Sequence, residues 1–119
     1  SVEWMTFAVP LNVENTSRAS LFFSDCWGEV EQLNGGQWSR VWSPICTLAA
    51  GTRVEMRPGE QRSLTLSVAA ATSGPGAPEW ESDTIAGSHR VTIVITNRRG
   101  MPSVTVASNA FLLEVVKAP

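Results

Sequence analysis

The amino-acid sequence predicts an all-β fold in which two antiparallel sheets share one core. Apolar residues recur at every second position in many short segments, and turn-forming residues separate these segments. No apolar stretch with helical periodicity and caps reaches about ten residues. About eight short strands with regular turn signals are typical of an antiparallel sandwich. A small closed barrel is the architectural alternative, and the strand pattern separates the two poorly.

Length and composition fit a single folded domain over residues 1–119. A chain of 119 residues buries roughly two thirds of its unfolded surface, and 43% apolar with 17% charged residues is near the globular average. Nine basic and eleven acidic residues give a net charge of −2, so we expect no nucleic-acid partner. No apolar run approaches the roughly 20 residues of a membrane helix, so we expect no membrane-spanning segment.

The N-terminal third predicts two strands. Apolar residues alternate over residues 7–13, which buries one face of an extended strand. Pro10 lacks an amide donor, so this strand is expected at a sheet edge, or to bend or change sheets there. The turn formers of residues 15–18 follow, and residues 19–24 resume as a second strand that ends near Cys26.

The central segment carries the strongest hairpin signal. Residues 29–33 and 37–42 flank Asn34-Gly35-Gly36, where positive backbone dihedrals carry little steric cost. Trp38 and Trp42 are four residues apart, so uninterrupted alternation places them on the same face. A further strand is expected over residues 53–56.

The C-terminal half predicts more strands and one long loop. The turn Pro58-Gly59-Glu60 precedes alternating apolar residues at 64–68, and residues 69–86 then break the rhythm with glycine, proline and acids. Connections of that length tend to be functional. Strands are expected at 90–96, 103–107 and 110–116, with a turn near residues 97–100.

Two cysteines indicate the compartment. Cys26 and Cys46 are the only thiols and both flank expected strands, so a disulfide between them is geometrically reasonable. Two buried thiols of a cytoplasmic protein are the alternative. A disulfide predicts an extracytoplasmic location: periplasmic, cell-surface or secreted. Because the chain opens at Ser1 without a leader, we expect that any signal peptide or lipid anchor has been removed.

Several short segments occur in a particular order over residues 9–116. They are Asn15-Thr16-Ser17, the Cys26 corner, Gly36-Gln37-Trp38, Pro58-Gly59-Glu60 before Leu64-Thr65-Leu66, Gly87-Ser88-His89-Arg90-Val91 and Ser108-Asn109-Ala110-Phe111. This arrangement resembles bacterial immunoglobulin-like domains, among them domains similar to a bacterial intracellular proteinase inhibitor. The resemblance implies an antiparallel two-sheet immunoglobulin-like sandwich of about 7–9 strands. The chain departs from the pattern by a long insertion at residues 74–83, and by His89 where a tyrosine is common.

No residue constellation predicts catalysis, a metal or a cofactor. His89 is the only histidine, and the adjacent Ser88 would point to the opposite strand face, so a catalytic triad is not formed; we expect a partly exposed residue. One histidine and two cysteines are too few soft ligands for a zinc site. The carboxylates of Glu29 and Glu31 share a strand face but show no contrast in environment, so they are expected to be solvated surface charge.

The tryptophans are the main candidates for binding. Five tryptophans and no tyrosine suggest either core positions, for Trp38 or Trp42, or aromatic platforms for sugars, for which the candidates are Trp27, Trp38, Trp42 and Trp80. Trp80 lies among proline, glycine and acids, where an exposed aromatic would anchor a contact. The predicted binding residues are therefore Trp80, Glu79 and Glu81.

These observations predict a non-catalytic extracytoplasmic module for protein binding or structural spacing in a bacterial envelope or secreted protein. The bacterial source is inferred from a chain rich in arginine with one lysine, so Asn15-Thr16-Ser17 is explained by turn chemistry rather than by glycosylation. An unknown protein is the expected partner. A carbohydrate-binding accessory module and a proteinase inhibitor that uses the 74–83 loop are the alternatives.

Overall fold

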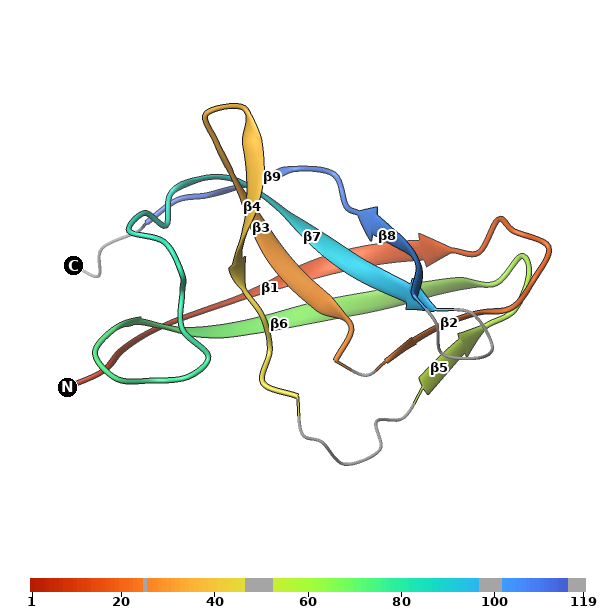
Figure 1. Ribbon diagram of the computed structural model, residues 1–119, viewed down its shortest axis with the longest axis horizontal. Coiled ribbons are helices and arrows are strands. Elements are labelled where there is room, and N and C mark those ends of the chain that lie inside the picture. Colours follow the sequence, from red (N-terminus) through yellow and green to blue (C-terminus); the bar gives the residue numbers. More distant parts are fainter. Residues whose placement is uncertain (25, 47–52, 97–101, 116–119) are drawn as a thin grey trace.

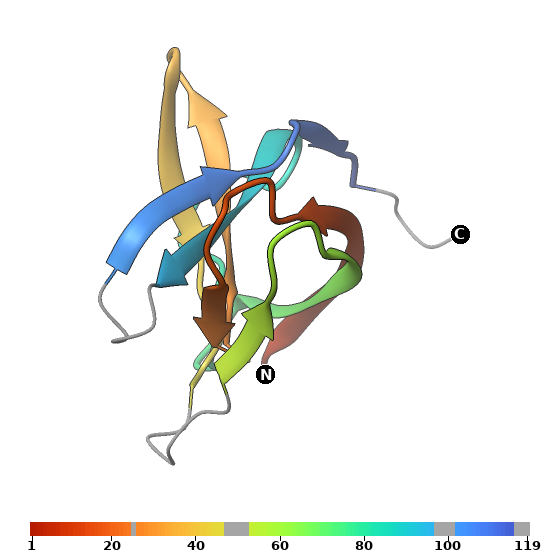
Figure 2. The same ribbon diagram turned by 90° about the vertical axis from the view of Figure 1, so that its right-hand side faces the viewer.

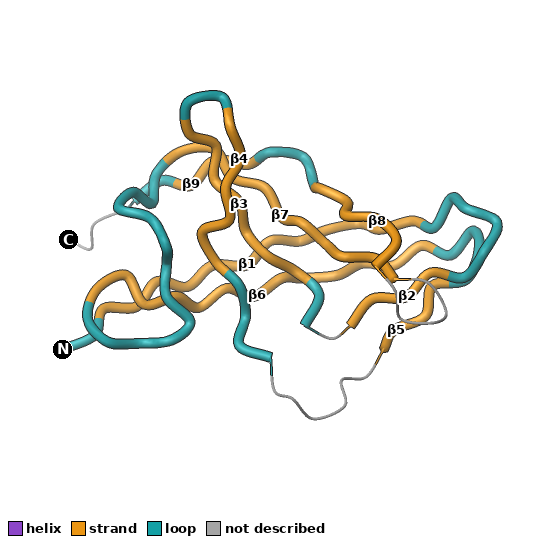
Figure 3. The backbone as a smooth tube through the Cα atoms, viewed as in Figure 1, coloured by secondary structure: helices purple, strands orange, loops and turns teal. Residues whose placement is uncertain are grey.

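The structure, a computed structural model, describes residues 1–24, 26–46, 53–96 and 102–115 (Figure 1). The expected turn near residues 97–100 lies outside these ranges. The described residues contain strands and no helix, so the all-β prediction is confirmed (Figure 3). The strands are β1 (Glu3–Glu14), β2 (Leu21–Ser24), β3 (Gly28–Asn34), β4 (Gln37–Trp42), β5 (Arg53–Met56), β6 (Gln61–Ser73), β7 (Gly87–Thr96), β8 (Pro102–Ala107) and β9 (Phe111–Leu113).

The strands form two antiparallel sheets. One contains β1 and β6, which pair from Glu14 with Gln61 to Glu3 with Ser73. The other has the order β4-β3-β7-β2-β5, and β8 and β9 also pair with β7. Thr92 pairs with both β3 and β8, so these two strands take opposite edges of β7. In Figure 2, β9 lies next to β1 of the other sheet.

The two sheets contribute to one hydrophobic core. Alternation along each strand turns one set of side chains inward, as the period-two pattern predicts. The first sheet supplies Val9, Leu66 and Val68, and the second supplies residues such as Val30 and Val91, which are fully buried. The core therefore lies between the sheets.

Pro10 lies on an edge strand, as predicted. Among the described strands, β1 pairs only with β6, and Pro10 stands opposite Thr65. A proline is tolerated there because its missing amide hydrogen is not needed by a second neighbour.

A bulge in β4 corrects the prediction for two tryptophans. The β3–β4 register shifts between Val30 and Glu31, and Val41 is the extra residue, so Trp38 and Trp42 do not share a face. Trp42 is buried in the core, and its indole N–H donates to the carbonyl of Ala69 (3.1 Å). Trp38 lies on the outer face of the sheet.

Two further expectations have clear outcomes. The predicted disulfide Cys26–Cys46 is present, with a Cα–Cα distance of 5.9 Å. It joins the segment before β3 to the segment after β4. The long loop is shorter than predicted, because β6 continues to Ser73, which pairs with Glu3 at the start of β1 after a register shift. The loop therefore covers residues 74–86.

No helix in the described part of the chain has the length and apolar character needed to cross a bilayer.

Candidate functional site

The predicted binding residue Trp80 is buried, so the expectation of an exposed aromatic anchor is wrong. Its side chain is 6% exposed and belongs to the core. The ring meets Phe7 of β1 edge-on at a centroid distance of 6.2 Å, and it lies 5.4 Å from the imidazole of His89. Trp80 therefore joins the loop to both sheets.

Hydrogen bonds hold this loop, residues 74–86 and hereafter the Trp80 loop, against the strands. The backbone N–H of Trp80 donates to Ala71 (2.9 Å), and that of Glu81 donates to Val41 (2.7 Å). The Trp80 indole N–H donates to the carbonyl of Thr84 (2.9 Å), which closes the loop on itself. A Cβ on Gly76 would lie only 2.8 Å from the side chain of Ala71, so this part of the loop fits closely.

His89 is part of the same closure, and the expected partial exposure is wrong. The ring is fully buried. Nδ1 lies 2.9 Å from the carbonyl of Gly87, so it carries the hydrogen, and Nε2 accepts from the amide of Gln32 (3.3 Å). The Gln32 amide also donates to Thr84 (3.0 Å) and its oxygen accepts from Ser82 (2.8 Å). Burial lowers the pKa of His89, which keeps the ring neutral.

The two predicted acids beside Trp80 remain on the surface. Glu79 and Glu81 are exposed, while Trp80 between them points inward. The carboxylate of Glu81 lies 4.0 Å from the guanidinium of Arg40, which also approaches Glu29 at 3.6 Å. The three predicted binding residues therefore do not meet at one exposed site.

The remaining tryptophans do not form the expected sugar platform. Trp42 and Trp80 are buried. The guanidinium of Arg90 lies 4.4 Å from the centroid of Trp38 and also binds Glu31 (2.6 Å). Trp27 is half-buried and meets Phe23 edge-on. Only Trp27 and Trp38, of the four candidates, keep exposed ring surface.

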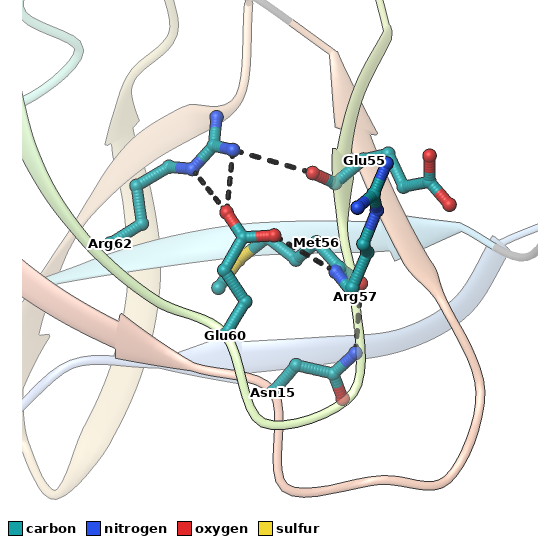
Figure 4. Close-up of polar contacts among 6 residues, drawn as sticks. All are labelled: Asn15, Glu55, Met56, Arg57, Glu60 and Arg62. Atoms are coloured by element: carbon teal, nitrogen blue, oxygen red, sulfur yellow. Dashed lines mark hydrogen bonds and ion pairs between the residues drawn. The ribbon is translucent and has the colours of Figure 1, made fainter.

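A buried asparagine anchors the crossing from β1 to the second sheet (Figure 4). Asn15 is 1% exposed, and its amide donates to the carbonyls of Ala19 and Met56 (both 2.9 Å). Its side-chain oxygen accepts from the backbone and hydroxyl of Ser17. The side chain is occupied by turn chemistry, which agrees with the reading of Asn15-Thr16-Ser17 as a turn.

The β5–β6 turn beside Asn15 is fixed by one carboxylate. Glu60 accepts from the backbone N–H of Arg57 (3.0 Å) and from the guanidinium of Arg62 (2.6 Å), which also reaches the carbonyl of Glu55 (Figure 4). The hydrogen bond from Arg57, followed by that from Arg62, lowers the pKa of Glu60. These hydrogen bonds hold the Pro58-Gly59-Glu60 turn in place, so Glu60 has a structural role there.

An open cleft of about 690 Å³ lies between the sheets beside β1. We call it the β1 cleft. Residues 9–15 form one wall and residues 107–111 form the other. The floor consists of apolar side chains from the second sheet: Leu21, Phe23, Met56, Ile93 and Ile95. Four of these floor residues are only 2–6% exposed, and Leu11, Val13 and Phe111, which are half-buried, add partly exposed apolar surface to the cleft. Such a surface can accept apolar side chains of a ligand.

The wall formed by β1 presents backbone groups that pair with no other described strand. Asn15 donates its N–H to Glu60 (3.0 Å) and accepts from Gly59 (2.8 Å), so its backbone groups point toward β6. Hydrogen-bonding direction alternates along an antiparallel strand. The backbone groups of Glu14, Asn12 and Pro10 therefore point away from β6, along the edge beside the cleft.

The opposite rim of the cleft is shaped by a break between β8 and β9. The backbone N–H of Ser108 donates to Val91 (2.8 Å), and its hydroxyl accepts from the Val91 N–H (2.9 Å). Asn109 and Ala110 then lie exposed at the rim. Sequence reasoning missed this cleft; its one signal was Pro10, which marks an edge strand but not what the edge faces.

Comparison of the chain with protein-family models, with curated proteins and with solved structures found no match. The fold and the site together define an all-β chain of two antiparallel sheets, with an apolar cleft beside the edge of β1 that has no partner among the described strands. In the described residues, no group of three or more histidine, cysteine, aspartate or glutamate side chains is arranged to hold a metal ion.

Proposed function

We propose that the chain is a non-catalytic, immunoglobulin-like module of a bacterial envelope or secreted protein, and that it binds a partner protein at the β1 cleft. The observation that carries this proposal is the cleft itself, in which the half-buried apolar side chains of Leu11, Val13 and Phe111 lie next to an edge of β1 that pairs with no described strand. Open apolar surface of this kind marks interaction sites. The two-sheet arrangement with one core supports the immunoglobulin-like sandwich.

The disulfide Cys26–Cys46 supports a location outside the cytoplasm, since disulfides persist in oxidising compartments. Thiol titration of protein isolated from its native compartment, denatured without reductant, tests this location. We expect no reactive thiols, and two reactive thiols would contradict it.

Paired capture experiments test the binding role. The native chain, Ala110→Arg at the cleft rim and Ala8→Arg are used to capture proteins from envelope and secreted fractions of the source organism. Ala8 is exposed on β1 but points away from the core, so it is a matched control. We expect a partner bound by the native chain and by Ala8→Arg, and lost with Ala110→Arg.

The other outcomes decide against parts of the proposal. Equal capture by all three proteins would place binding on another surface, such as the outer face that carries Trp38 and Arg90. Capture by none would favour a structural spacer over a binding module. Thermal unfolding of each variant, followed by circular dichroism, shows that loss of capture is not loss of fold.

A further inference from the structure

We propose that the occupant of the β1 cleft is a short extended segment of the partner protein that adds to the edge of β1 as a new strand. Alternate apolar side chains of this segment enter the cleft, and a basic residue of the segment lies beside Glu14. This inference rests on the proposed function and names the chemistry of the partner.

The backbone of β1 favours a strand over a compact ligand. Asn12 and Glu14 each direct an N–H and a C=O along the free edge, and Pro10 adds a C=O. Donors and acceptors at this two-residue spacing match the backbone of an extended chain, which is how peptides add to exposed sheet edges. An acyl chain offers these groups no hydrogen-bonding partner, and sugar hydroxyls do not repeat at the two-residue spacing of a peptide backbone.

The cleft provides room for the side chains of the added strand. Side chains of an added strand alternate between the two faces of the sheet, so every second one points toward the core. The inward residues of β1 here, Leu11 and Val13, line the cleft, and Phe23, Met56 and Ile93 form its floor. We therefore expect an apolar residue at every second position of the partner segment.

Proline sets the length of the pairing. Pro10 has no N–H on the free edge, so a strand that continued past it toward the N-terminus would leave one of its own acceptors unpaired. The usable edge is therefore the part from Pro10 to Glu14, about five residues in extended conformation.

The charge of Glu14 indicates which residue type the partner segment carries at its end. Glu14 is the one charged residue among the side chains that line the cleft in the described structure, and no basic side chain lines it. A lysine or arginine of the partner beside Glu14 complements this charge.

The same features disfavour a second copy of this chain as the occupant. In a two-fold antiparallel pairing of the usable edge, centred on Asn12, Pro10 of one copy faces Glu14 of the other at both ends. Pro10 offers no N–H to its partner, so two hydrogen bonds are missing from this short ladder. Proline on an edge is one of the devices that prevent self-association of sheets.

The test is a selection followed by a measurement on chemically modified peptides. A phage-displayed library of random peptides about seven residues long is selected on the native chain, long enough to span the usable edge. We expect the enriched sequences to alternate apolar and polar residues and to carry a lysine or arginine. Calorimetry on synthetic peptides then compares the native chain with Ala110→Arg and Ala8→Arg, and we expect about tenfold weaker binding only for Ala110→Arg.

Backbone methylation separates strand addition from simple occupancy of the cleft. In a peptide bound as a strand, alternate backbone N–H groups face β1 and the others face away. We expect about tenfold weaker binding when the nitrogens that face β1 are methylated, and little change when the others are methylated. In amide hydrogen exchange, the N–H groups of Asn12 and Glu14 gain protection on binding, while that of Ala8 does not. With Glu14→Lys, a peptide whose basic residue is replaced by glutamate binds better than the original.

Each failure points to a different part of the argument. If no peptide is enriched, and capture from cell fractions is also insensitive to Ala110→Arg, the cleft is not a binding site and the proposed function fails. If peptides bind and Ala110→Arg weakens them, but neither methylated edge matters, strand addition alone is wrong. A second copy as occupant would be revealed by concentration-dependent dimerisation that Ala110→Arg abolishes.

Discussion

The two sides of the core between the sheets differ in how they are covered. On one side the Trp80 loop crosses from β6 to β7 and is sealed by the indole of Trp80, the imidazole of His89 and the amide of Gln32. On the other side, β1 has an edge without a partner among the described strands, and this edge borders the β1 cleft. The segment that carries Trp80 is therefore part of the core, and the segment that carries Pro10 is the one that we propose binds a partner.

The largest expected effect is on the sealed side. We expect Trp80→Ala to lower the free energy of unfolding by about 3–5 kcal/mol, because it removes a buried aromatic side chain that contacts both sheets. Trp4, which is 52% exposed, is the matched control, and Trp4→Ala is expected to cost less than about 1 kcal/mol. Chemical denaturation of both variants makes the comparison. Equal losses would mean that Trp80 does not seal the core.

Reduction of the disulfide has the next largest effect. The Cys26–Cys46 bond spans a sequence separation of 20, and a closure of that size contributes about 3 kcal/mol. We expect this loss in denaturation of the native chain with reductant present. The double variant Cys26→Ser, Cys46→Ser, which contains no thiol, should show the same loss without reductant and no change on adding it. Unaltered stability in both cases would contradict a structural role for the bond.

The anchor at Asn15 comes third. Asn15→Ala leaves the carbonyl of Met56 without its buried donor, and we expect a loss of about 2 kcal/mol. Asn12→Ala, at an exposed position on the same strand, serves as the control, with an expected change within about 0.5 kcal/mol. Asn15 lies at one end of the β1 cleft, so its substitution should lower the free energy of unfolding and leave the Trp80 loop in place. Fluorescence of the buried tryptophans checks this, because disruption of the Trp80 loop would change it.

The pH dependence of stability tests the seal in another way. Burial lowers the pKa of His89, so the unfolded chain binds a proton more readily than the folded one. The stability that comes from the neutral ring is present above the ordinary value of 6.5 and is lost as the pH falls below it toward the folded pKa. A proton on Nε2 would also place an N–H against the amide of Gln32. Denaturation midpoints between about pH 7.5 and 5.5 should fall with pH, and His89→Gln should flatten that slope.

The smallest effect belongs to the open side. Ala110 is exposed at the cleft rim, so Ala110→Arg should alter the stability of the free chain by no more than about 0.5 kcal/mol while weakening partner binding about tenfold. A large loss of stability would show that the rim packs against the core and that the cleft is closed in solution.

The sequence pattern predicts local structure well where local chemistry decides it. The strand at residues 53–56 coincides with β5, and the Asn34-Gly35-Gly36 signal gives the β3–β4 turn, with positive φ at both glycines. The disulfide follows from the positions of Cys26 and Cys46 beside expected strands. The strand and the turn are decided by residues close in sequence, whereas the cysteines are 20 residues apart and are predicted to pair because they are the only two.

The errors arise where distant segments decide the outcome. Trp80 lies among polar residues and glycine, and only its contacts with Phe7 and His89 reveal that it is buried. The bulge at Val41 reverses the side-chain alternation in β4, and a period-two pattern contains no information about it. The β1 cleft depends on which edge of β1 pairs with β6, which is a property of the topology and not of any motif.

Amide hydrogen exchange of the free chain tests the central comparison most directly. The N–H groups of Trp80 and Glu81 donate to backbone carbonyls on the sealed side, whereas those of Asn12 and Glu14 point out of the sheet along the open edge. We predict slow exchange at Trp80 and Glu81 and rapid exchange at Asn12 and Glu14. Protection of Asn12 and Glu14 in the free chain, or rapid exchange at Trp80 and Glu81, would contradict the account.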